Sequence, residues 1–82
     1  MHWMILSPRE EELIMRPVPE GADTYNAHTL RMVQQRVTRQ GSQSPELELS
    51  EVEFQRVKRA RRDWKGGYEK ALQAVLDAAA RH

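Results

Sequence analysis

The sequence predicts a small, mainly α-helical domain of three helices with a minor two-stranded β element. Two capping boxes, led by Ser7 and Ser50, each precede a segment with helical periodicity. The segment 50–80 is the longest of these, and it carries a continuous apolar stripe. Two short stretches, 4–6 and 47–49, have the length and side-chain pattern of strands that can pair.

The composition fits one domain, residues 1–82, near the lower size limit for independent folding. A chain of 82 residues buries only about 60 to 65% of the surface that it exposes when unfolded. Charged residues make up 30% of the chain, so the hydrophobic core must be small. The chain has no cysteine, which excludes a disulfide framework and suits a reducing, cytoplasmic location. No segment approaches the ~20 apolar residues of a membrane span.

The first helix is expected to begin after Ser7 and to be short. Ser7 can accept a hydrogen bond from the backbone amide of Glu10, the Glu10 side chain can reach back to Ser7, and Pro8 suits the first helical position. Pro17 disfavours helical geometry at the residue before it. The helix should therefore end there and give way to an extended connector over 17–21.

The second helix is expected to run from a cap at Asp23 or Thr24 to about Gln40. Gly41 is well placed as its C-terminal stop, and the segment 41–45 has the composition of a loop. The apolar stripe of this helix is narrow. It consists of Ala27, Leu30, Val33 or Gln34, and Val37.

The last helical region is expected to be one long helix over 50–80, or two helices with a slight bend at Gly66-Gly67. The apolar stripe keeps its phase across the glycine pair because Trp64 and Tyr68 are four residues apart. Two glycines nevertheless cost a helix about 2 kcal/mol relative to alanines, so a structural reason for them is expected. The favoured reason is the close approach of another helix or chain, and the next is a turn.

The two segments that lead from a strand into a helix resemble each other. The similarity is compatible with an internal duplication, and also with coincidence because capping boxes are common. If the two strands pair, their ribbon needs helices on one face or a second chain at its edge. The matching positions are Met4, Leu6, Ser7, Glu10 and Ile14 in the first segment, and Leu47, Leu49, Ser50, Glu53 and Val57 in the second.

The predicted function is non-catalytic protein interaction, either with another protein or by self-association. The apolar stripe of the last helix is wider than the thin second helix can cover, and its alanines allow another helix to pack closely. The stripe is therefore expected to form both a core seam and the contact with a second copy or partner. The residues expected at this contact are Trp64, Tyr68, Leu72, Val75, Leu76 and Ala79.

The alternative function is that of a small nucleic-acid-binding regulator with a basic stripe on the last helix. A rotation of about 100° per residue aligns four basic side chains near Trp64 and Tyr68, which can stack on bases. Against this, the net charge is only +1, and Arg59 can pair with Asp63 and Lys65 with Glu69. The four basic residues are Lys58, Arg61, Arg62 and Lys65.

No catalytic, metal or cofactor site is expected. The three histidines, His2, His28 and His82, are too scattered in the sequence to form a recognisable ligand set. No serine or histidine has an identifiable acid partner, and no glycine-rich phosphate motif surrounds Gly66-Gly67. The sequence therefore predicts neither an enzyme nor a small-molecule substrate.

Overall fold

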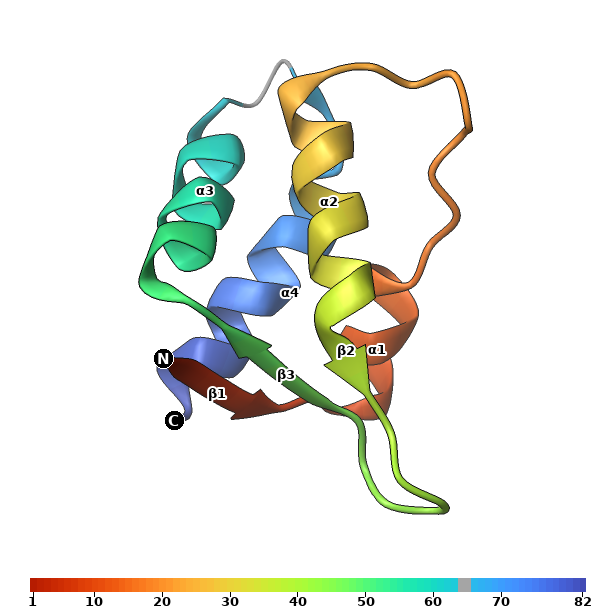
Figure 1. Ribbon diagram of the computed structural model, residues 1–82, viewed down its shortest axis with the longest axis vertical. Coiled ribbons are helices and arrows are strands. Elements are labelled where there is room, and N and C mark those ends of the chain that lie inside the picture. The colour runs from red at the N-terminus through yellow and green to blue at the C-terminus, as the bar shows by residue number, and fades with distance from the viewer. Residues whose placement is uncertain (64–65) are drawn as a thin grey trace.

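The computed structural model describes residues 1–63 and 66–82, and in this part of the chain it has four helices and a three-stranded antiparallel sheet (Figure 1). The predicted mainly α class with a minor sheet is confirmed, although the predicted number of helices is one too few. The elements are β1 (His2–Ile5), α1 (Pro8–Ile14), α2 (Tyr25–Arg36), β2 (Val37–Thr38), β3 (Glu46–Leu49), α3 (Glu51–Arg62) and α4 (Glu69–Ala80).

The sheet lies at one end of the helical layer, with β3 between β1 and β2 (Figure 1). The two predicted strands pair antiparallel, with Met4 opposite Leu47. Met4, Leu47 and Leu49 are fully buried, whereas Trp3 and Ile5 on the other face are exposed. This alternation follows from the two-residue period of a strand, and it leaves one face of the sheet for the helices to cover.

The hydrophobic core lies between the inner face of the sheet and the four helices. All of these elements contribute to it except the two-residue strand β2, whose Val37 packs at the margin. The largest fully buried apolar side chains are Met4, Leu6, Ile14, Leu30, Val33, Leu47, Leu49, Val57, Leu72 and Val75.

Side-chain caps begin three of the helices, as the sequence predicts. Ser7 and Glu10 form a complete capping box at the start of α1, and Ser50 and Glu53 form another at the start of α3. Thr24, one of the two expected candidates, caps α2 by accepting a hydrogen bond from a backbone amide of the first turn. These caps satisfy backbone amides that have no partner within their own helix.

The second helix is shorter than predicted, because α2 ends at Arg36 and not near Gln40. Val37 and Thr38 take extended geometry and pair with β3 as the short strand β2, which suits β-branched residues. Gly41 is therefore not a helix stop. It lies in the turn between β2 and β3 with a φ of +60°.

The prediction of one long final helix is wrong, because α3 ends at Arg62 and α4 begins at Glu69. Gly67 has a φ of +80° and Tyr68 a φ of +59°, and a right-handed helix cannot continue through such left-handed geometry. The apolar phase does not reveal this break because both helices bury a stripe in the same core.

The other glycine of the pair accommodates a close approach of α2. Asn26 on α2 is only 1% exposed, and its side-chain amide donates hydrogen bonds to the carbonyl oxygens of Ala60, Asp63 and Gly67 over 3.0, 3.1 and 2.9 Å. A Cβ atom on Gly66 would lie 2.4 Å from Cγ of Asn26. Both expected explanations of the glycine pair therefore apply: Gly66 makes room for Asn26, and Gly67 forms the turn.

A second polar cluster ties the C-terminal residues to α1 and β1. Arg81 donates two hydrogen bonds to the Glu10 carboxylate, over 2.5 and 2.6 Å, and one to the carbonyl oxygen of Ile5 over 3.1 Å. The backbone amide of Ile5 donates to Nε2 of His82 over 3.2 Å. These contacts occupy polar groups on the outer edge of β1, and they hold the two ends of the chain side by side (Figure 1).

Replacing Gly66 by alanine should lower the free energy of unfolding by about 2 kcal/mol, because the new methyl group overlaps the Asn26 side chain. Gly21→Ala is the matched control, since no atom lies within 4 Å of the position of its Cβ and its φ is not left-handed. Urea denaturation measures both. Asn26→Ala removes the side chain that the new methyl group overlaps, so Gly66→Ala should lower the free energy of unfolding by less in the Asn26→Ala background. An equal loss in both backgrounds would contradict the overlap between these two positions.

The Arg81–Glu10 contact predicts a specific acid sensitivity. Hydrogen bonds from Arg81 are the main reason that the pKa of Glu10 is lowered from 4.5 to about 2. A lowered pKa stabilises the folded state above the unfolded-state pKa, and this contribution is lost as the pH falls from about 4.5 to about 2. The Tm should therefore fall more steeply over this range in the natural protein than in Glu10→Gln, which keeps a capping-box side chain. Parallel Tm curves for the two proteins would refute this role of Glu10.

Candidate binding surface on α3

The exposed side of α3 carries a dense group of basic side chains. Val57 and Ala60 are the buried residues of this helix, so the side chains around them in its C-terminal half project outward or along its flanks. The acidic residues of α3, Glu51 and Glu53, are both in its first turn. We call the basic group the α3 basic surface, and its members are Arg56, Lys58, Arg59, Arg61 and Arg62.

One member of the α3 basic surface is held by acidic and polar groups of α4. Arg61 forms an ion pair with Glu69, with 3.2 Å between nitrogen and oxygen, and its Nε donates to the side chain of Gln73 over 2.8 Å. No ion pair involves the other four members among the described residues, and the expected Arg59–Asp63 pair is absent there. Four cationic side chains therefore have no ion-pair partner within the described part of the chain.

Two of these four cations lie near aromatic rings. The Arg56 guanidinium lies 5.3 Å from the centre of the Tyr25 ring, and the Lys58 ammonium lies 5.8 Å from the centre of the Phe54 ring. Both distances fall within the range of cation–π attraction, which holds a charge in place without cancelling it.

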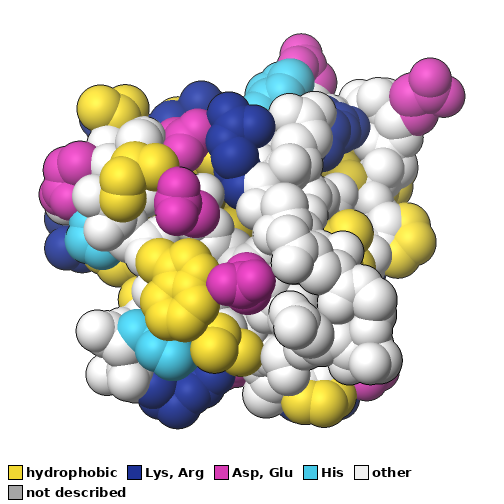
Figure 2. All heavy atoms as spheres, turned by 60° about the horizontal axis from the view of Figure 1, so that its bottom comes forward, with side chains coloured by type: hydrophobic (Ala, Val, Ile, Leu, Met, Phe, Trp, Pro, Cys, Tyr) yellow, Lys and Arg dark blue, Asp and Glu magenta, His cyan; other side chains and the backbone are white. Residues whose placement is uncertain are grey.

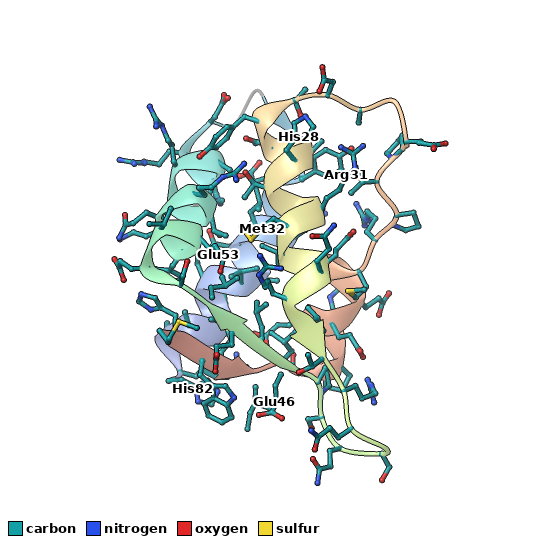
Figure 3. The ribbon with its side chains drawn as sticks, in the orientation of Figure 1. His28, Arg31, Met32, Glu46, Glu53 and His82 are labelled. Atoms are coloured by element: carbon teal, nitrogen blue, oxygen red, sulfur yellow. The ribbon has the colours of Figure 1, made fainter. Side chains whose placement is uncertain are left out.

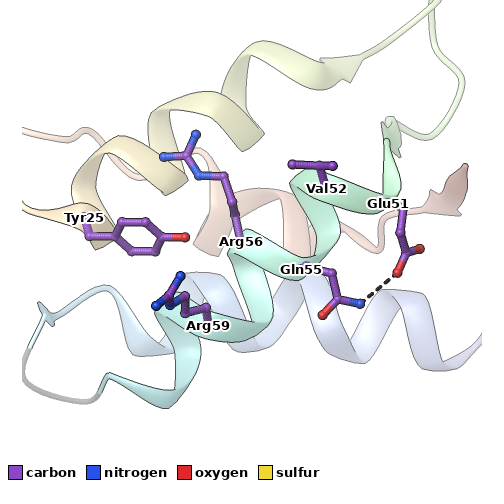
Figure 4. Close-up of a pocket in the computed structure, with 6 residues that line it drawn as sticks. All are labelled: Tyr25, Glu51, Val52, Gln55, Arg56 and Arg59. Atoms are coloured by element: carbon purple, nitrogen blue, oxygen red, sulfur yellow. Dashed lines mark hydrogen bonds between the residues drawn. The ribbon is translucent and has the colours of Figure 1, made fainter.

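Two shallow hollows, each of about 300 Å³, flank α3. The hollow toward α4 is lined by Gln55, Lys58, Arg61, Arg62 and Leu76. The hollow toward α2 is lined by Tyr25, Glu51, Val52, Gln55, Arg56 and Arg59 (Figure 4). The helix therefore forms a ridge with basic side chains on both of its sides.

The structure brings together most of the basic stripe that the sequence suggested. Lys58, Arg61 and Arg62 line one hollow, whereas Lys65 and the neighbouring Trp64 lie outside the described residues. Tyr68 does not line either hollow beside α3. It lines a separate hollow with Arg16 and Lys70 at the start of α4.

The predicted interaction seam on the last helix is largely occupied by the chain itself. Leu72 and Val75 are fully buried in the core, where α1 and α3 pack against α4. Tyr68, Leu76 and Ala79 are half-buried at the core margin. Leu72 and Val75 thus have no surface to offer a partner in this structure, and contact with a second copy stays a prediction.

Tyr25 and Val52, which both line the hollow between α2 and α3, were not expected to be functional from the sequence (Figure 4). Tyr25 is 41% exposed at the start of α2, and Val52 is 72% exposed in the first turn of α3. Val52 lies off the stripe marked by Val57 and Ala60, and that position was the available sign that it faces water.

The face of the molecule over the sheet has a different character. Figure 2 shows hydrophobic side chains there separated by acidic, basic and histidine side chains. The indole of Trp3 donates a hydrogen bond to Glu46 over 2.8 Å. Its ring packs edge-to-face with the His82 ring, with 5.5 Å between the ring centres. Glu46 and His82 both lie at the sheet end of the molecule in Figure 3. This face therefore presents no continuous patch of one kind.

Two substitutions on α4 should differ strongly in their cost. Leu72→Ala should lower the free energy of unfolding by about 3 kcal/mol, because it leaves a cavity in the core. Leu76→Ala should lower it by only about 1 kcal/mol, because the Leu76 side chain is half-buried. Urea denaturation measures both values. If Leu72→Ala instead changed the molecular mass in solution and left monomer stability intact, the placement of Leu72 in the chain's own core would be wrong.

The described residues contain no cluster of three or more histidine, cysteine, aspartate or glutamate side chains arranged to hold a metal ion. None of the helices in the described ranges has the length and apolar character needed to cross a membrane. No family model, curated protein or solved structure matches the chain.

Proposed function

We propose that the protein is a non-catalytic binding module that binds nucleic acid through contacts between the α3 basic surface and backbone phosphates. One observation carries the proposal. Five basic side chains occur within seven consecutive residues of one helix, and four of them have no ion-pair partner among the described residues. Guanidinium and ammonium groups of this kind are the usual phosphate ligands of nucleic-acid-binding proteins.

The net charge of +1 does not by itself oppose this function, because some acidic residues outside the second half of α3 are paired with arginines of their own. Glu10 pairs with Arg81, Glu11 with Arg39, and Glu53 with Arg36. Exposed charges act over about 10 Å at 0.1 M salt, so a phosphate beside α3 responds mainly to the charges on that side. The local surplus of positive charge on the second half of α3 therefore affects phosphate binding more than the net charge of the chain does.

Helix stability alone accounts for part of the basic group. Basic residues in the last turn of a helix interact favourably with its dipole, by about 0.3 to 1 kcal/mol each. This explains Arg59, Arg61 and Arg62, which lie in the last turn of α3. It does not explain Arg56 and Lys58, which lie further from the end and extend the positive charge along the helix.

Self-association through α4 has less support than phosphate binding. The two most central residues of the predicted seam, Leu72 and Val75, are fully buried within the monomer. Among the described residues, the exposed large apolar side chains lie at the N-terminus and β1, after α1, and at the starts of α2 and α3, where Tyr25 and Val52 line one hollow. Protein interfaces of standard size need a larger continuous surface.

Changing Lys58 and Arg62 together to glutamine should weaken nucleic-acid binding about tenfold or more at low salt. Each lost phosphate contact should also reduce the slope of log K against log salt by about 1. Fluorescence anisotropy with labelled duplex and single-stranded DNA, each at two salt concentrations, measures both quantities.

The matched control is Arg9→Gln with Arg16→Gln, which changes the net charge equally on exposed residues outside α3. This variant should bind like the natural protein. If the two double variants lost affinity equally, binding would depend on net charge and not on the α3 basic surface. If the natural protein bound neither nucleic acid at low salt, while light scattering showed a dimer, the self-association expected from the sequence would replace this proposal.

A further inference from the structure

The hollow between α2 and α3 combines exposed apolar groups with uncompensated positive charge. We call it the Tyr25 hollow. The Tyr25 ring extends from α2 toward α3, with Arg56 and Arg59 on either side of it, and Val52 lies farther along α3 (Figure 4). An aromatic ring and an aliphatic side chain that remain exposed among basic groups form a surface suited to a flat apolar ligand that carries negative charge.

The two ends of the Tyr25 hollow differ in charge. Arg56 and Arg59 lie at the end beside Tyr25, and Glu51 lies at the other end (Figure 4). Glu51 accepts a hydrogen bond from Nε2 of Gln55 over 2.8 Å and contacts His2 over 2.5 Å. The hydrogen bond from Gln55 and the contact with His2 lower the pKa of Glu51, because both stabilise its carboxylate form. An anionic group should therefore prefer the arginine end, and hydrogen-bond donors the Glu51 end.

A nucleotide has the chemistry that this arrangement complements. Its phosphate can meet Arg56 and Arg59, and the face of its base can lie against Tyr25 and Val52. Amino and ring N–H groups on the edge of the base can donate to oxygen atoms of Glu51 or Gln55. In a duplex, stacking and pairing cover both the faces and this edge of each base, so only an unpaired base can make all these contacts.

We infer that the nucleic acid bound by the α3 basic surface is single-stranded and that one unpaired base occupies the Tyr25 hollow. This inference rests on the proposed function, and it narrows the ligand from nucleic acid in general to single-stranded nucleic acid. The basic residues on both flanks of α3 hold the backbone, and Tyr25 distinguishes a single strand from a duplex.

The test compares Tyr25→Ala with the natural protein in anisotropy titrations. The probes are a labelled 12-nucleotide DNA of mixed sequence and the same sequence as a duplex. Loss of the ring should weaken single-strand binding about tenfold, as expected for one base–aromatic stack, and should change duplex binding little. Tyr25→Phe keeps the ring, so it should retain the preference for the single strand.

Trp3→Ala is the matched control, because Trp3 is an aromatic residue of similar exposure, 45%, on the far side of the sheet from the core. It should leave both affinities unchanged. Thermal unfolding of each variant checks the fold, and the partial exposure of Tyr25 predicts that Tyr25→Ala remains folded.

The outcomes separate this inference from the proposed function. A single-strand preference that disappears in Tyr25→Ala and persists in Tyr25→Phe would support it. Equal binding of duplex and single strand, unaffected by Tyr25→Ala but weakened by the Lys58 and Arg62 changes, would overturn the inference and leave the proposed function standing. No binding of either probe would overturn both. Competition by polyglutamate as strong as that by single-stranded DNA would overturn both in favour of an acidic protein partner.

Discussion

The hydrogen bonds of the Asn26 side-chain amide determine how α2, α3 and α4 fit together. Backbone carbonyl groups in the last turn of a helix have no partner within that helix, and burying them unpaired is costly. The Ala60 carbonyl already accepts from the backbone amide of Asp63, and the Asn26 amide gives it a second hydrogen bond. Asn26 also donates to the carbonyls of Asp63 and Gly67, where the chain turns toward α4. Its neighbour Tyr25 points outward from the same turn of α2 and reaches Arg56. The turn of α2 that carries the buried Asn26 amide therefore also carries the aromatic ring of the proposed site.

Features that depend on neighbours in the sequence were predictable. The capping boxes at Ser7 and Ser50 and the short strands 4–6 and 47–49 were found because a cap or an alternation is complete within a few residues. The basic stripe was found for the same reason, since the spacing of Lys58, Arg61 and Arg62 alone puts them on one flank of a helix.

Features that depend on distant partners were not predictable in this way. The break before α4 packs against Asn26, which lies 40 residues from Gly66 in the sequence, and β2 is defined by its pairing with the edge of β3. The same reason applies to the Tyr25 hollow. Its two sides come from different helices, so neither Tyr25 nor Val52 stands out in its own segment.

The junction of Arg81 with Glu10 and Ile5 has a consequence for the order in which the molecule can form. The first helix packs mainly against α4, and the outer edge of the first strand is bonded by the residues just after α4. Contacts between segments so far apart in the sequence slow folding, because a long loop must close before they form. During synthesis, the apolar side chains of α1 therefore stay without their main neighbour until residues 69–81 have emerged from the ribosome. Until then the nascent chain exposes an unprotected strand edge, and its solubility in that interval depends on the charged residues of α1.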